Sequence, residues 1–181
     1  MELYEKTLNS KDIFKGRVIH ITLDEVELPN GHKSSREVVN HPGGVCIAPL
    51  NEKNELYFVR QYRYPYHEVV LELPAGKLEK GTTPLENGIR ELKEEIGATG
   101  KDYKFLGELY PSPGYCAEII YLYFCRVESL GECCPDDDEF LNVEAIHIDK
   151  AVEMVLNNKI KDSKTQTAVL KTAMLLKKGV L

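Results

Sequence analysis

The sequence predicts an α/β protein in which strands fill most of the first three quarters of the chain. Runs rich in β-branched and aromatic residues recur as far as residue 148, and three segments carry helix signals. The length of 181 residues corresponds to about one domain. With 43% hydrophobic and 29% charged residues, such a chain buries enough surface to fold without a disulfide or a structural metal.

The strand signals begin near the N-terminus. Residues 3–40 alternate loosely between apolar and polar types, and Asn30-Gly31 is the strongest hairpin signal, so we expect a small antiparallel sheet there. Residues 45–50 and 55–63 predict a second hairpin around a polar turn. Further strands are expected at 69–74, 104–110, 119–127 and 143–148. The continuous apolar character of the last two favours central positions in a sheet.

The most clearly marked helix lies in the middle of the chain. Residues 83–86 have the pattern of a capping box with proline at the first helical position, and Gly97 stands where a helix C-cap belongs. We therefore expect a helix over 84–96, with its apolar residues on one stripe. Ser163 with Gln166 predicts the start of a C-terminal helix that ends near residue 179, and a shorter helix is expected over 150–157.

Charge and cysteine content exclude several classes of function. The formal net charge of -6 opposes nonspecific binding to nucleic acid, because a polyanion would approach against the protein's own field. The 5 cysteines are odd in number and lack metal-ligand spacing, so we expect free thiols in a reducing cytoplasm. No run is apolar enough to span a membrane, and the first residues lack the apolar core of a signal peptide. We expect a soluble protein that does not bind a membrane.

Three carboxylates share one face of the helix expected over 84–96. Glu91, Glu94 and Glu95 fall close together on this face and lie near the helix C-terminus, where the helix dipole favours cations. Like charges at this spacing repel, so the face favours a hard divalent ion such as Mg²⁺. The alternative is a solvated face on which Arg90 and Lys93 are local partners.

The residues around this face resemble a known family. Residues 76–98 resemble the Nudix box, G-x5-E-x7-R-E-U-x-E-E-x-G-U, at nearly every defining position, and 71–76 (LELPAG) resembles the lead-in of the ADP-ribose pyrophosphatase branch. The resemblance implies a Nudix fold, with a mixed β-sheet sandwiched between helices. It also implies that catalytic divalent metals lie on Glu91, Glu95 and the carbonyl of Ala75, with Glu94 as a further candidate.

One position departs from the Nudix box. Thr82 stands where the pattern has its first glutamate, which in the family pairs with the arginine that matches Arg90. We expect Glu79 or Glu86 to compensate and metal ligation to persist. If the loop lacks such support, Thr82→Glu should raise thermal stability or activity. A non-catalytic relative that only binds its ligand is the alternative that this departure leaves open.

The resemblance continues into the substrate-binding segments. Pro113 follows Gly97 at the offset associated with the ADP-ribose group, and Glu118 also matches. Segments 36–39 (REVV) and 60–63 (RQYR) resemble those of the family, and guanidinium groups suit a diphosphate because they bind phosphate oxygens in a bidentate manner. The substrate-binding candidates are Arg36, Glu37, Arg63, Ser112, Pro113, Gly114 and Glu118.

An acidic segment after the predicted strand 119–127 completes the resemblance. Residues 136–143 resemble the family segment D-E-D-E-F-I-E-V, in which glutamates serve the metals and the attacking water. Glu139 aligns with the metal-side glutamate, and Asp137 aligns with a candidate general base. Either carboxylate could accept the proton of the attacking water.

Together these features imply a Mg²⁺-dependent enzyme, with Mn²⁺ as a possible substitute, that hydrolyses ADP-ribose to AMP and ribose 5-phosphate. Two alternatives remain: a Nudix hydrolase of another nucleoside diphosphate derivative, such as a nucleotide sugar or an oxidised nucleotide, and a non-catalytic ADP-ribose sensor. We expect an N-terminal β-sheet subdomain over 1–40 and a Nudix hydrolase domain over 41–181. The resemblance also implies a homodimer in which the N-terminal sheet, through Arg36 and Glu37, contributes to the partner's site.

Overall fold

The computed structural model describes residues 2–134 and 140–181, which form two compact units. The first unit comprises Met1–Gly43 with Tyr110–Ile119, and the second comprises Gly44–Leu109 with Ile120–Leu181. Each unit is described by itself below. In the part of the chain that the structure covers, no helix is both long and apolar enough to cross a membrane.

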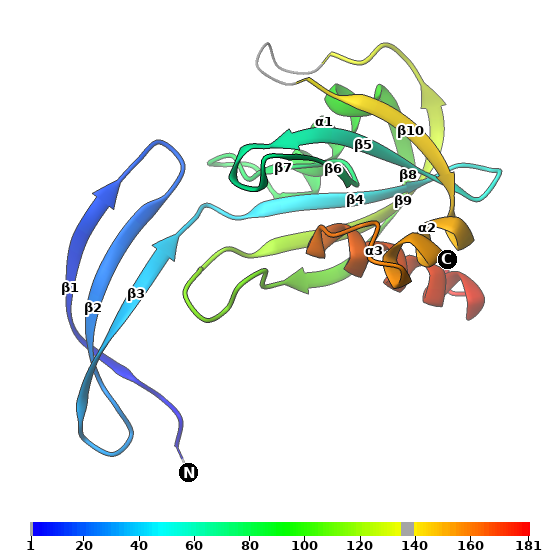
Figure 1. Cartoon of the computed structure of the whole chain (residues 1–181). Helices are drawn as coiled ribbons and strands as arrows, with labels where there is room; N and C mark the ends of the chain where they lie inside the picture. Colours follow the sequence, from blue (N-terminus) through cyan, green and yellow to red (C-terminus); the bar gives the residue numbers. More distant parts are fainter. Residues whose placement is uncertain (1, 135–139) are drawn as a thin grey trace. The chain divides into compact units, whose positions relative to one another are not determined.

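The first unit is built on a three-stranded antiparallel sheet in the order β1 (Lys6–Lys15), β2 (His20–Glu27), β3 (Lys33–Asn40) (Figure 1). The expected small N-terminal sheet is therefore confirmed. Its β2–β3 turn contains Asn30-Gly31, where Gly31 has a φ of 82° that only glycine adopts at no cost. β1 is exposed along its whole length, so the sheet has little core of its own.

The second unit contains a seven-stranded mixed sheet. The main order is β10-β5-β4-β9-β8, with β6 paired to β5 and β7 paired to β4. The strands are β4 (Gly44–Leu50), β5 (Glu55–Arg63), β6 (Glu68–Glu72), β7 (Ala75–Lys77), β8 (Ala98–Leu109), β9 (Ile120–Leu130) and β10 (Asn142–His147). β4 and β9 run parallel, whereas the other pairs are antiparallel. A short 3-10 helix, η1 (Tyr64–Tyr66), joins β5 to β6.

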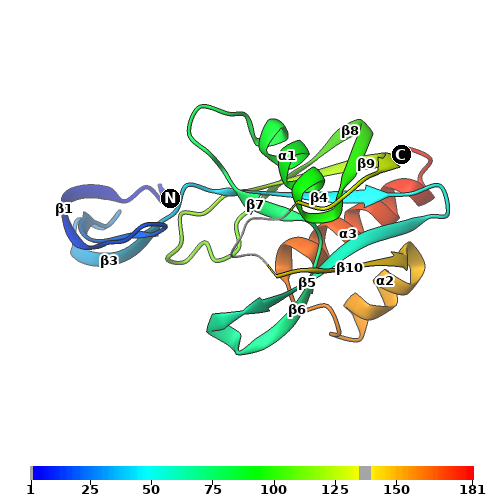
Figure 2. The same cartoon turned by 90° about the horizontal axis from the view of Figure 1, so that it is seen from above.

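Helices cover both faces of this sheet. α1 (Pro84–Ile96) lies on one face, and α2 (Ile148–Leu156) and α3 (Ser163–Lys177) lie on the other (Figure 2). β4 is buried on both faces, which explains its unbroken apolar sequence. Ile47 packs towards Leu92 and Ile96 of α1, whereas its neighbours Cys46 and Ala48 belong to the larger core beneath α2 and α3. The expected α/β sandwich is confirmed.

Three sequence-based expectations need correction. β10 lies at one end of the main strand order, and its burial alternates as expected for an edge strand. The last apolar residue of the predicted strand, Ile148, begins α2 instead. The short helix accordingly starts before residue 150. The cap of α3 is Asp162 and not Ser163, since the Asp162 carboxylate accepts the N–H of Thr165 at 2.9 Å.

Candidate active site

Helix α1 is fixed at both ends by the local signals that its sequence carries. The Thr83 N–H donates to Glu86 Oε2 at 2.7 Å, and the Glu86 N–H donates to Thr83 Oγ1 at 3.3 Å, which completes the capping box. At the other end, Gly97 adopts the left-handed conformation with φ 65°. Leu92 and Ile96 of the expected apolar stripe pack against the sheet, whereas Ile89 is exposed. The packed half of the stripe fixes the orientation of the helix and of its acidic residues.

We define the acidic cluster of α1 as Glu91, Glu94 and Glu95, of which the first two pair with the guanidinium of Arg90. Arg90 contacts Glu91 at 2.6 Å and Glu94 at 2.5 Å. Glu91 is 8% exposed and Glu95 is 3% exposed. Partial burial acts to lower the pKa of Arg90, but Glu91, Glu94 and Glu79 outweigh it and hold that pKa above its usual value. One cation thus serves several carboxylates.

The backbone of β7 closes against this cluster. The N–H of Ala75 donates to Glu95 Oε2 at 3.0 Å, and a Cβ added at Gly76 would overlap the carboxylate of Glu91. The predicted site residue Ala75 is therefore at the acidic cluster, and it is the amide of Ala75 that contacts a carboxylate. Only glycine at position 76 leaves room for Glu91 in this arrangement.

The donor set of this region fits a hard divalent cation. Nearly buried carboxylates stand beside main-chain groups, and oxygen donors of this kind are preferred by Mg²⁺ and Mn²⁺. Among the residues described, no three His, Cys, Asp or Glu side chains converge on one point by themselves. Asp137 and Glu139, the two other carboxylates predicted for the site, lie outside the described residues.

The departure at Thr82 is compensated within the loop before α1. Glu79 Oε1 lies 3.2 Å from Arg90 Nη2 and so supplies the missing charge, as expected for one of the two candidates. Glu86 is instead used by the capping box. The Thr82 hydroxyl donates to the Glu79 carbonyl at 3.0 Å and accepts from the side-chain amide of Asn87, which is buried. Thr82 is thus part of the support of this loop.

Arg63, predicted to bind phosphate, is engaged in a second charged group that we call the Glu72 network: Arg63, Glu72, Asp162 and Lys164. Arg63 donates to both oxygens of Glu72 at 2.6 Å, and Lys164 contacts Glu72 and, at 3.0 Å, Asp162. Burial acts to raise the pKa of Glu72, yet Arg63 and Lys164 outweigh it and hold that pKa below its usual value. The role of Glu72 and Lys164 was missed, although Glu72 lies in segment 71–76, which resembles the family.

The other predicted substrate residues lie in the first unit. Arg36 of β3 donates to Glu5 at 2.9 Å and 2.6 Å, and Glu118 Oε1 lies 3.3 Å from His41 Nδ1. Glu37 is exposed on the same strand as Arg36 and pairs in register with Leu23 of β2. Ser112, Pro113 and Gly114 form a turn in which the Ser112 carbonyl accepts the N–H of Cys116 at 3.0 Å. Hydrogen bonds from Val39 to Tyr115 at 2.8 Å and from Ala117 to Val39 at 2.9 Å fix this turn beside β3.

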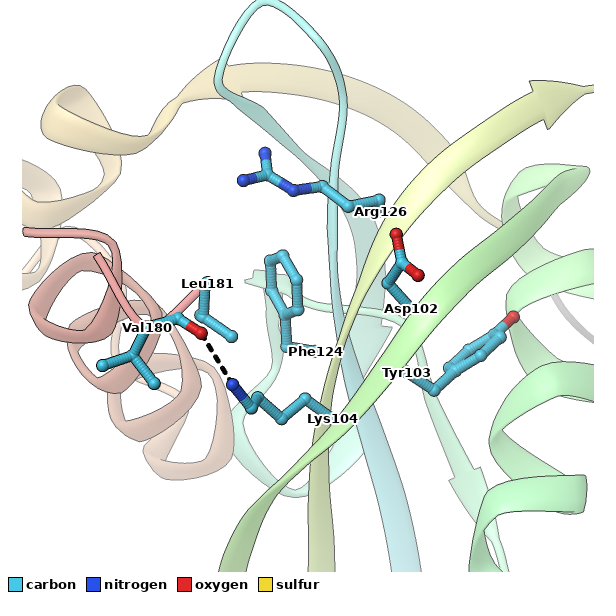
Figure 3. A pocket seen from close by; sticks show the side chains of 7 residues that line it. All are labelled: Asp102, Tyr103, Lys104, Phe124, Arg126, Val180 and Leu181. Atoms are coloured by element: carbon cyan, nitrogen blue, oxygen red, sulfur yellow. Dashed lines mark hydrogen bonds between the residues drawn. The ribbon is translucent and has the colours of Figure 1, made fainter. Parts of the chain in front are cut away.

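A pocket of about 420 Å³ lies elsewhere in the second unit and contains none of the predicted site residues (Figure 3). Residues of β8 and β9 and the last two residues of the chain line it. The guanidinium of Arg126 lies 5.5 Å from the centre of the Phe124 ring, and Lys104 donates to the Val180 carbonyl at 2.6 Å. The contact of Lys104 holds the C-terminal residues against β8. The lining contains no residue of the acidic cluster, so the pocket is separate from it.

Comparison with known proteins identifies both segments of the chain. A profile of the NUDIX domain matches residues 40–168, and a profile of the nucleoside diphosphate sugar hydrolase N-terminal domain matches residues 5–39. The chain is 41% identical over 167 residues to a methanol dehydrogenase activator of Bacillus methanolicus, covering 91% of this chain and 90% of that protein. It is 38% identical over 169 residues to an ADP-ribose pyrophosphatase of Bacillus subtilis, covering 92% and 91%.

Solved structures agree with this assignment at the level of the fold. The crystal structure of an ADP compounds hydrolase matches with a TM-score of 0.85 at 20% sequence identity and covers 100% of both chains. Because the NUDIX profile covers more than half of the sequence and two relatives above 30% identity align over most of it, the chain belongs to the Nudix hydrolase family.

Proposed function

We propose that the protein hydrolyses the diphosphate bond of ADP-ribose to AMP and ribose 5-phosphate and that it uses Mg²⁺. The observation that carries this proposal is the acidic cluster of α1 backed by the amide of Ala75, in a chain 38% identical to an ADP-ribose pyrophosphatase. Nudix hydrolases generally depend on a divalent metal ion, and the donor set here suits one. Mn²⁺ is expected to substitute, since it prefers the same oxygen ligands.

Each candidate residue has a distinct part in this proposal. Glu91, Glu95 and Glu139 would hold the ion together with the carbonyl of Ala75. A bound cation would neutralise the charge of the diphosphate and polarise its phosphoryl oxygens as a Lewis acid. Glu94, Asp137 and Glu139 are the candidate acceptors for the proton that the attacking water must lose.

The predicted substrate residues have separate parts in this proposal. Arg36 and Arg63 would bind the diphosphate, Glu118 would accept hydrogen bonds from ribose hydroxyls, and the turn 112–114 would pack against the substrate. Arg63 keeps one guanidinium nitrogen, Nη1, outside its two hydrogen bonds to Glu72. We also propose a homodimer in which Arg36 and Glu37 serve the partner's site. The exposure of Ile13 (55%) and Phe14 (53%) on β1 supports an interface on this sheet.

A reducing cytoplasm is the proposed location. All five cysteines are free, and burial raises the pKa of Cys125 to about 12 and that of Cys46 further. These two thiols are therefore inert packing groups.

The homodimer is tested separately by light scattering, in which a fully active monomer would contradict the proposed interface.

The activity is tested by incubating the purified protein with Mg²⁺ and a panel of substrates, with products followed by chromatography. The panel contains ADP-ribose, other ADP-sugars, GDP-mannose, NADH, diadenosine polyphosphates and 8-oxo-dGTP. We expect fast release of AMP from ADP-ribose and its loss in EDTA. Preference for another compound would assign a different nucleoside diphosphate derivative, and binding of ADP-ribose without turnover of any compound would indicate a sensor.

A further inference from the structure

The first turn of α3 contacts the segment that leads from β6 to β7. The N–H of Leu73 donates to Thr165 Oγ1 at 2.9 Å, and the hydroxyl belongs to a residue that is 0% exposed. One residue earlier on each side, Lys164 pairs with the buried carboxylate of Glu72. The segments lie 92 residues apart in the sequence, so this contact is purely tertiary.

This segment ends at the acidic cluster of α1. The segment 73–74 between β6 and β7 is called the crossover below. The Pro74 carbonyl accepts the N–H of Ile47 at 2.9 Å, so β4 holds the crossover on one side and α3 holds it on the other. The next residue is Ala75, whose N–H donates to Glu95 at 3.0 Å. Gly76 then passes so close to Glu91 that a Cβ would not fit. A shift of the crossover would therefore move the backbone against which both carboxylates rest.

We propose that Thr165 and Lys164 are positioning residues for Glu95 and Glu91, acting through the crossover between β6 and β7. The inference rests on the proposed cation-binding role of these carboxylates. Groups that orient metal ligands typically change metal affinity or activity by about 10- to 100-fold when they are removed. Thr165 and Lys164 would orient the carboxylates indirectly, because they contact Leu73 and Glu72 at the crossover.

The chain offers a matched control close to these two segments. Lys161 Nζ lies 2.9 Å from Glu68 Oε2, but these side chains are 58% and 39% exposed. An exposed ion pair of this kind contributes little to stability. Lys161→Met therefore removes an ion pair between the segment before α3 and the start of β6, and it leaves the contacts of the crossover intact.

The first experiment measures amide hydrogen exchange by NMR in the metal-free protein. In Thr165→Val, we expect the Ala75 amide to exchange at least about tenfold faster than in the wild type, while buried strand amides such as that of Phe58 keep their rates. Thr165→Ser keeps the acceptor and should restore protection of Ala75. An equal acceleration of all slow amides would show only global destabilisation and would overturn the proposal.

The second experiment measures Mn²⁺ binding by electron paramagnetic resonance, with kcat and KM for ADP-ribose alongside. Lys164→Met should weaken Mn²⁺ binding by about tenfold and lower kcat with little change in KM, whereas Lys161→Met should match the wild type. If Thr165→Val does not fold, the comparison of Lys164→Met with Lys161→Met tests the positioning role instead. Wild-type Mn²⁺ affinity and Ala75 protection in Lys164→Met would contradict the positioning role.

Failure of the proposed function gives a different pattern. If Glu95→Gln binds Mn²⁺ as the wild type does, the cation site lies elsewhere and the proposed function is wrong. The exchange rate of Ala75 in Thr165→Val still decides whether α3 positions the crossover, because that measurement uses no metal.

Discussion

The second unit contains two clusters of charged side chains that differ in their balance. The Glu72 network pairs two carboxylates with two cations, and every member has a partner within the network. In the acidic cluster of α1, Glu91 and Glu94 share the single guanidinium of Arg90, which also pairs with Glu79. A balanced buried cluster is complete by itself, whereas an unbalanced one is completed by a charge from outside. This difference is consistent with a structural role for the Glu72 network and with the cation-binding role that we propose for the acidic cluster of α1.

The largest expected effect comes from removing one charge of the acidic cluster. Glu95→Gln should lower kcat by about a thousandfold, or about 4 kcal/mol, because a ligand of the catalytic ion is lost. The metal-free variant should unfold at the wild-type temperature or slightly above it, since like-charge repulsion falls. Thermal unfolding with and without Mg²⁺ checks the second part, because the ion should stabilise only the wild type.

A matched control for this variant is Glu153→Gln, which removes a carboxylate of the same kind from the exposed pair with Lys150 on α2. It should leave kcat and thermal stability unchanged. A near-wild-type rate in Glu95→Gln would show that the acidic cluster is not the catalytic one.

The balanced cluster should respond in the opposite sense. Glu72→Gln leaves Arg63 and Lys164 without their shared carboxylate and should lower the free energy of unfolding by about 3 kcal/mol, measured by urea denaturation. The contrast between the two clusters would be contradicted if Glu72→Gln were as stable as the wild type while Glu95→Gln were destabilised.

Acid pH should weaken the Glu72 network in a direction that follows from its pKa. The pKa of Glu72 in the folded protein lies below the usual 4.5. A carboxyl of this kind contributes stability that is fully present above its unfolded pKa and is lost as the pH falls through the folded one. The free energy of unfolding should therefore fall below about pH 4.5, and it should fall less steeply in Glu72→Gln. Equal slopes for the two proteins would contradict the assignment.

The smallest effect is expected at Thr82. The sequence alone suggests that Thr82→Glu restores a missing charge, but Glu79 already pairs with Arg90 and the Thr82 hydroxyl bonds to Asn87. We therefore expect Thr82→Glu to lower the free energy of unfolding by about 1 kcal/mol, because the hydrogen bond to the buried Asn87 is lost, without a gain in kcat. A clear gain in either quantity would show that Glu79 does not replace the glutamate of the Nudix box.

Local signals predicted the parts of the fold that depend on neighbours in the sequence. Helix α1 has the expected ends because its capping box and Gly97 lie within a few residues of the groups that they satisfy. The β2–β3 turn follows in the same way from Asn30-Gly31. Where two local signals compete, prediction fails by one residue, as at Asp162 and Ser163.

Features that depend on distant residues were not predictable by this route. Arg63 was assigned to phosphate from the resemblance of segment 60–63 to the family, and nothing near it in the sequence indicates that it pairs with Glu72. Lys164 reaches the same carboxylate across 92 positions. The edge position of β10 likewise depends on which strands pair beyond it. The Nudix resemblance supplied the acidic cluster, but not the contacts that hold its backbone support in place.

The long separation between Leu73 and Thr165 has a consequence for the newly made chain. Helix α1 closes its own caps soon after it leaves the ribosome, but the N–H of Leu73 waits for an acceptor that is made 92 residues later. At ordinary rates of synthesis this delay is on the order of 5–20 s. The segment before the acidic helix can therefore be fastened by α3 only seconds after α1 has been synthesised.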